Sequence, residues 1–249
     1  YIQQYREFSL ALDECTETAF KDAINNFFPK ESKEKMLAPI VPLIVGGDDL
    51  TVVCDGQYAL EFTREFLQNF EQETDRHQGI NKVADKAFNK NRLSACAGVA
   101  IVKRHFPFSV AYHLAEELIK SAKAVKQKIV CQETDTIPKN TPFPCSAIDF
   151  HILYDTTGIE LDKIRELLKP ESTTQLYNRP YVVTAIDDLK EASHGQKWAE
   201  NHQWKRLRDR AFALKDEKIT NSQSHAIRTA LFANQGDAQY KLIQQRFPD

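Results

Sequence analysis

The residues best suited to chemistry are four consecutive ones, Gly46, Gly47, Asp48 and Asp49, which stand between two apolar segments. Apolar, β-branched segments joined through glycine predict two strands with a tight turn. Two adjacent carboxylates on such a turn repel each other unless a cation lies beside them. Mg²⁺ and Mn²⁺ prefer carboxylate oxygens, and Mg²⁺ is commonly shared with substrate phosphates. The pattern therefore predicts that Asp48 and Asp49 hold Mg²⁺ or Mn²⁺ for a nucleoside triphosphate.

An ordinary hairpin turn is the alternative, because Asp and Gly are common turn residues that need no metal. The order of the predicted elements favours catalysis. Helix, hairpin, helix, strand, helix and strand is the order of a nucleotidyl-transfer palm, an α+β domain with a ferredoxin-like sheet and helices on one face. Two metal ions about 4 Å apart would then activate an attacking hydroxyl and stabilise the leaving pyrophosphate.

Hydrophobic periodicity supplies these elements. Helices are expected at residues 5–28, 57–72 and 108–128, strands at 39–45, 50–54, 93–102 and 146–154, and loops at 75–91 and 131–145. Beyond a short helix near 161–168, further helices are expected at 187–192, 198–214, 222–234 and 238–247, with Ser222 as an N-cap. We therefore predict a palm domain over residues 1–185 and a small all-α domain over residues 186–249.

Composition limits the class of protein. The chain has 249 residues, of which 42% are hydrophobic and 27% charged, with a formal net charge of −2, as in an ordinary globular protein. No apolar run approaches the roughly 18 residues that a membrane span needs, so no membrane partner is expected. The five cysteines include no CxxC pair, which favours reduced thiols in a cytoplasmic protein over a zinc site. Because Tyr1 stands where a start Met is expected, we interpret the chain as a piece of a longer one.

Four segments resemble one known family. They are PLIVGGDDLTVV at 42–53, YALEFTREFL at 58–67, LSACAGVAIVKRHFPFSVAYHLAEELIKSAK at 93–123 and NRPYVV at 178–183. Together they look like the second palm domain of the large polymerase–cyclase subunit of type III CRISPR effector complexes, over roughly residues 1–185. The tail resembles the small C-terminal helical domain of that subunit more loosely. Diguanylate cyclases carry a related hairpin with Glu-Phe after the acidic residue, whereas Asp49 and Leu50 stand here.

The resemblance implies an activity and a site. Such subunits join ATP through 3′–5′ bonds into cyclic oligoadenylate messengers when their complex binds target RNA. It implies that Asp48 and Asp49 are catalytic and bind Mg²⁺ or Mn²⁺, and that Gly46 and Gly47 let the ATP triphosphate approach the backbone. The other implied nucleotide-binding residues are Ser94, Lys120 and Lys123.

Lys120 and Lys123 have a plainer interpretation, since a lysine on a helix is commonly only a solvated charge. His113, in the same helix, is expected to be structural.

Two departures from the family pattern leave an alternative open. A palm normally supplies a further metal-binding Asp from a strand before its first helix, and that strand is missing here. No His-Asp dipeptide of an HD-type nuclease is present either, so we expect no DNA cleavage. The alternative is therefore a non-catalytic palm that acts as a nucleotide sensor or scaffold in a ribonucleoprotein.

The tail is mildly basic and carries a possible contact surface for partners. Basic residues outnumber acidic ones from Lys190 onward, and an aromatic and basic cluster consists of Trp198, Trp204, Lys205, Arg206, Arg208 and Arg210. Such a cluster suits guide or target RNA. The alternative is a solvated helix face with core tryptophans. Other subunits of the CRISPR ribonucleoprotein complex are the partners that this tail favours.

Overall fold

The computed structural model describes residues 2–27, 40–153, 160–169, 175–213 and 220–232. The helices are α1 (Ile2–Phe27), α2 (Gly56–Arg76), α3 (Gln78–Phe88), α4 (Phe108–Ala122), α5 (Val125–Lys128), α6 (Leu161–Leu167), the 3₁₀ helix η1 (Asp188–Glu191), α7 (Gln196–Asn201), α8 (Trp204–Ala213) and α9 (Asn221–Phe232). The strands are β1 (Ile40–Gly46), β2 (Asp49–Cys54), β3 (Cys96–Ile101), β4 (Ala147–Ile152) and β5 (Tyr181–Val182). None of the described helices is long and apolar enough to cross a membrane.

The strands form two sheets within the described residues. β1 and β2 make an antiparallel hairpin, and the second sheet has the order β3-β4-β5. In that sheet β3 is parallel to β4, and β5 is antiparallel to β4. The expected α+β palm-like fold is confirmed, but the one continuous sheet is present as two parts.

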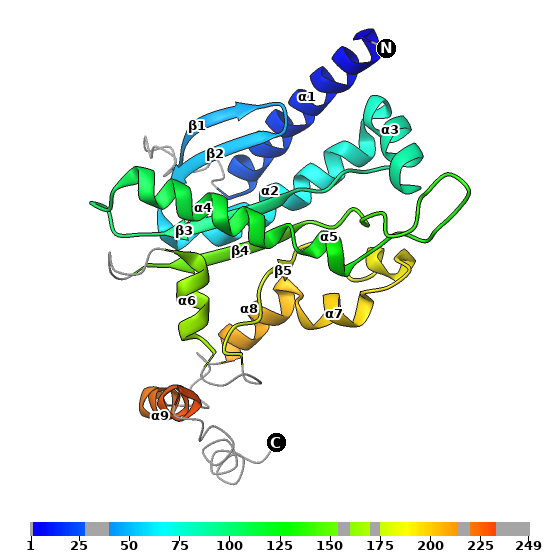
Figure 1. Cartoon of the computed structure of the whole chain (residues 1–249). Coiled ribbons are helices and arrows are strands. Elements are labelled where there is room, and N and C mark those ends of the chain that lie inside the picture. The colour runs from blue at the N-terminus through cyan, green and yellow to red at the C-terminus, as the bar shows by residue number, and fades with distance from the viewer. Residues whose placement is uncertain (1, 28–39, 154–159, 170–174, 214–219, 233–249) are drawn as a thin grey trace.

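Helices cover both faces of the three-stranded sheet (Figure 1). Because side chains alternate along a strand, Ala97 and Val99 of β3 join the core cluster that contains the α2 phenylalanines. Gly98 and Ala100 lie on the opposite face, against α4. The expectation that all helices lie on one face is therefore wrong for α4.

The main core connects the two sheets. It is built around α1 and α2, with Phe20 and Phe62 in an edge-to-face pair at 6.0 Å. The hairpin packs against this core through Val45, Leu50 and Val52. The β3 side chains Ala97 and Val99 pack against the same core. The hairpin is thus anchored by its inward side chains, which fixes where its tip lies.

The predicted loop at 75–91 is wrong. α2 continues to Arg76, and α3 follows after a single residue, His77. Only Ile80 and Ala84 of α3 are buried, and Ile80 packs with Ala11 and Cys15 of α1. Because only two residues of α3 are buried, the apolar positions are too few to show a helical period in the sequence.

Three other features differ from the sequence prediction. The expected helix 108–128 is divided into α4 and α5, and 198–214 is divided into α7 and α8. Ser222 is not the N-cap of α9: Thr220 Oγ1 accepts from the Gln223 N–H at 3.3 Å, and Gln223 Oε1 accepts from the Thr220 N–H at 2.8 Å. This reciprocal pair is a capping box. The predicted helix 238–247 lies outside the described residues.

Candidate functional site

The Gly-Gly-Asp-Asp turn lies at the tip of the β1–β2 hairpin. Gly46 pairs with Asp49, so Gly47 and Asp48 form a two-residue loop. Gly47 has a φ of 60°, in the left-handed region that glycine adopts without steric cost. Positive φ at the first loop residue is what a type II′ turn requires. The sequence prediction of a strand–turn–strand unit is confirmed.

Helix α1 holds this turn from outside the hairpin. Asp13 Oδ1 accepts a hydrogen bond from the Gly47 N–H at 2.8 Å, and Thr16 Oγ1 donates to the Gly47 carbonyl oxygen at 2.7 Å. Residues three apart lie on the same face of a helix, so one face of α1 binds the two peptide units on either side of the Gly47 Cα. Gly46 also lies against this contact, since a Cβ there would be 3.3 Å from Asp13 Oδ1.

Sequence reasoning missed Asp13 and Thr16. A signal was available, because Thr16 is a polar residue inside the apolar stripe of α1 and is only 2% exposed. Buried hydroxyl groups are normally hydrogen-bonded. A threonine in such a position therefore needed an acceptor on a neighbouring element, and the turn supplies it.

Asp48 and Asp49 are both exposed at the tip. Their carboxylates are consecutive and are not joined to any cation by an ion pair in the described part of the chain. No group of three or more His, Cys, Asp and Glu side chains gathers as a metal site among the described residues. Two free carboxylates nevertheless match the donor set of a Mg²⁺ ion that takes its remaining ligands from phosphates and water. The residues present therefore fit part of the coordination of such a cation.

The other expected nucleotide-binding residues lie around the start of β3. Ser94 is half-buried just before this strand, while Lys120 and Lys123 are exposed at the C-terminal end of α4. Burial raises the pKa of the Cys96 thiol at the first position of β3. The positive charges of Lys126 and Lys123 oppose this rise, so both lysines lie near the start of the strand. Lys126, on α5, was not singled out from the sequence.

The directions of β2 and β3 show how the start of β3, near Lys123, lies relative to the turn. A Cβ on Gly56, just after β2, would lie 3.1 Å from Ile101 at the C-terminal end of β3. The C-terminal ends of β2 and β3 are thus neighbours, and the turn and the start of β3 lie at the opposite ends of these strands. No ion pair joins Lys120 or Lys123 to the turn in the described part of the structure, which leaves both ammonium groups available.

His113 does not belong to this site. It is exposed on α4, and its ring nitrogens lie 4.0 Å from Glu116 and 3.8 Å from Glu117 on the same helix.

The tail residues are divided between core and surface. Trp204 is buried edge-on against Phe150 and Tyr181 at 6.2 Å from each. Lys205, Arg206 and Arg210 are exposed and Arg208 is half-buried.

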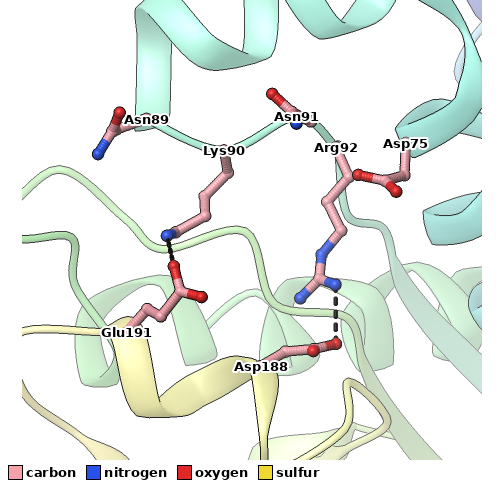
Figure 2. A pocket seen from close by; sticks show the side chains of 7 residues that line it. All are labelled: Asp75, Asn89, Lys90, Asn91, Arg92, Asp188 and Glu191. Carbon is pink, nitrogen blue, oxygen red and sulfur yellow. Dashed lines mark hydrogen bonds and ion pairs between the residues drawn. The ribbon is translucent and has the colours of Figure 1, made fainter.

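A charged cleft of about 250 Å³ lies elsewhere, between the end of α3 and η1 (Figure 2). Its charges are paired across it: Arg92 Nη1 lies 2.8 Å from Asp188 Oδ2, and Lys90 forms an ion pair with Glu191. Behind the cleft, Glu71 is buried and accepts hydrogen bonds from the Ser146 N–H and the Thr184 hydroxyl. Both cations that line the cleft are thus paired with acids across it, which makes it a structural junction between α3 and η1.

The Gly-Gly-Asp-Asp hairpin is backed by helices and has a parallel β3–β4 pair beside it, an arrangement that fits a palm domain of the nucleotidyltransferase-like superfamily. The family model "Cas10/Cmr2, second palm domain" matches residues 2–130, just over half of the chain. The chain belongs to the Cas10/Cmr2 family, whose members are large subunits of type III CRISPR complexes. No curated protein is significantly similar to it.

Proposed function

We propose that the hairpin turn binds ATP with divalent cations and joins ATP through 3′–5′ bonds into cyclic oligoadenylate. The observation that carries the proposal is the pair of exposed, unpaired carboxylates, Asp48 and Asp49, on a turn that α1 holds in place. A preorganised donor pair loses little conformational freedom when it binds a charged ligand. Membership of the Cas10/Cmr2 palm family supports the proposal further, because these palm domains belong to the nucleotidyltransferase-like superfamily.

Each residue has a definite part in this proposal. Asp48 and Asp49 supply carboxylate oxygens, and Gly46 and Gly47 present backbone without side chains, so that a triphosphate can lie against it. Lys120 and Lys123 attract the phosphates, and Ser94 faces the nucleotide from the start of β3. Two cations bound about 4 Å apart would activate the attacking 3′-hydroxyl and stabilise the leaving pyrophosphate.

Two carboxylates are few for two cations. The proposal therefore includes one more acidic residue, on a strand that the described residues do not contain. β2 and β3 each have a single ladder neighbour in the described sheets, so each has an edge open to such a strand. The proposal also places the chain in a complex with the other type III subunits, where target RNA switches on synthesis.

The test uses labelled ATP and Mn²⁺, with the products separated by chromatography. The chain is assayed alone, with a longer N-terminal region, and within its complex bound to target RNA. Asp48→Asn with Asp49→Asn is expected to lower the rate of product formation by about 10²-fold or more, as for the loss of a transition-state contact. Asp85→Asn, an exposed acid of α3, is the control and should leave the rate unchanged.

Unchanged synthesis by the double variant would show that the hairpin is not the metal site. Absence of product from all three forms, together with ATP binding that needs no Mn²⁺, would favour the sensor or scaffold instead.

A further inference from the structure

A second concave surface lies between α5, the end of β4, the segment 175–181 and α7. We call it the β4–α7 groove. Its volume is about 990 Å³, and its lining includes no residue of the Gly-Gly-Asp-Asp hairpin. Pockets for organic ligands typically measure 300–1,000 Å³. The groove is therefore large enough for a nucleotide, and it is separate from the site proposed above.

The groove is positively charged. Lys128 and Arg179 line it, and none of the described lining residues is Asp or Glu. Behind Arg179, among the described residues, Asp149 is fully buried and is shared by two arginines: it forms an ion pair with Arg165, and Arg179 Nη1 lies 3.9 Å away. One carboxylate thus faces two guanidinium groups. Charge remains on the groove side for an anion.

Burial has left this positive charge incompletely compensated. Desolvation lowers the pKa of Arg179, and desolvation together with Arg179 lowers the pKa of the neighbouring His151. Both shifts mean that positive charge is disfavoured there as the chain stands. An anionic group in the groove would reverse them.

Aromatic and guanidinium planes line the same surface. Arg165 lies over the Tyr177 ring at 5.4 Å, and the Trp198 and His202 rings are stacked at 4.0 Å with an interplanar angle of 18°. Tyr177, Trp198 and His202 all belong to the groove lining. Bases of unpaired nucleotides stack on such aromatic and guanidinium planes, while lysine and arginine contact their phosphates. An acidic peptide would use the cations but would leave the rings unused.

We propose that the β4–α7 groove binds a nucleoside phosphate, either a free nucleotide or part of single-stranded RNA. Its phosphate lies against Arg179 and Lys128, and its base stacks beside Tyr177.

The test measures binding of short labelled oligouridylate and oligoadenylate to the full chain by fluorescence anisotropy. It is done in EDTA and in the Asp48→Asn, Asp49→Asn background, so that metal-dependent binding at the hairpin contributes nothing. Lys128→Ala, Arg179→Gln and Tyr177→Ala test the groove. Lys82→Ala, an exposed lysine of α3, is the charge-matched control.

Loss of one base stack is expected to weaken binding about fivefold or more in Tyr177→Ala. Lys128→Ala should weaken binding and reduce the salt dependence by about 0.7 in the slope of log K against log salt. The control should match the parent. Competition by AMP at the same site would identify a free nucleotide as the ligand, whereas binding of RNA without competition by AMP would identify the strand.

Two results would overturn the proposal. One is an RNA affinity that is the same in Lys128→Ala, Tyr177→Ala and the control. Because Lys128 is exposed, its variant is expected to keep the fold. The other is binding of an oligoaspartate peptide as tight as that of RNA, which would assign the groove to an acidic protein segment. Circular dichroism and thermal melting identify whether Arg179→Gln has folded.

Discussion

Gly47 is held by two side chains that lie more than thirty positions earlier in the chain, Asp13 and Thr16. Their hydrogen bonds fix both the N–H and the carbonyl of the same residue. The carboxylate that follows, Asp48, therefore starts from a fixed peptide. Metal and substrate chemistry tolerates little misplacement, since 1 Å can cost about 10²-fold in rate. Under the proposed function, the clamp gives α1 a positioning role for the carboxylates at the turn.

Thr16→Val tests the clamp, because it keeps the shape of the side chain and removes its hydroxyl. The Gly47 carbonyl loses a donor, so the free energy of unfolding should fall by about 1 kcal/mol. Under the proposed function the rate of ATP polymerisation should fall while KM for ATP changes little. Thr18→Val, on the same helix, is the matched control. A loss of stability with no loss of rate would mean that the clamp is purely structural. Urea titration and product assays give the two quantities.

Glu71 gives a prediction about pH. Burial raises the pKa of this carboxyl above its usual value, although Arg92 and the hydrogen bonds from Ser146 and Thr184 oppose the shift. A raised pKa means that the folded state favours the protonated acid. Stability from this group is complete below the unfolded pKa and is lost as pH rises through the folded pKa.

Glu71→Gln removes that titration and keeps an oxygen that accepts both hydrogen bonds. We expect the variant to unfold at a higher temperature than the parent at pH 7, with the difference shrinking as the pH falls toward 4. Melting curves from pH 4 to pH 8 measure this. A difference that grows on acidification would show that the charged form is the one the fold stabilises, through Arg92.

At the level of elements, the contact between β3 and α4 depends on a single missing side chain. A Cβ on Gly98 would lie 2.2 Å from the Ala115 carbonyl oxygen and 2.6 Å from the Ile119 backbone nitrogen. Both atoms are helix backbone, so no side chain can move aside. Gly98→Ala must therefore push α4, with Lys120 and Lys123 at its end, away from the sheet.

Gly98→Ala is expected to lower the free energy of unfolding by about 3 kcal/mol, at the upper end of overpacking costs. Ala97→Gly, on the other face of the same strand, serves as the comparison and should cost about 1 kcal/mol through backbone entropy and lost packing. Chemical denaturation gives both values. A Gly98→Ala protein as stable as the parent would mean that β3 and α4 can separate without loss.

The sequence predicted those elements whose apolar period was wide or whose turn chemistry was specific. The hairpin was readable because Gly46 and Gly47 interrupt a β-branched run, and α2 because its phenylalanines repeat at helical spacing. α3 was missed because only Ile80 and Ala84 are buried. The clamp by Asp13 and Thr16 was readable only in part: a threonine in the apolar stripe of α1 signals a buried hydrogen bond, but nothing local identifies the distant turn as its partner. Asp149 illustrates the same limit, because its arginine partners come from other elements.

At the scale of the whole molecule, the part after residue 186 contributes to the palm core. Trp204 opens α8 and is 7% exposed, within the cluster that contains Phe62 of α2 and Ile148 of β4. The side chain packs across Phe150 and Tyr181, which belong to the central strand and its neighbour. Its indole N–H is buried without a hydrogen-bond partner among the described atoms. The tryptophan therefore contributes through packing of its rings.

Trp204→Ala is expected to lower the free energy of unfolding by 3–5 kcal/mol, as for other large-to-small core changes, and to do so in one cooperative transition. Trp204→Phe removes the unpartnered N–H and keeps an aromatic ring, so it should cost much less. Denaturant unfolding, followed by both circular dichroism and hydrogen exchange on α2, makes the comparison. If Trp204→Ala loosened only α8 and left α2 protected, the helices after residue 186 would be an independent domain. If α2 loses protection as well, the palm depends on α8 to keep the hairpin and its carboxylates in place.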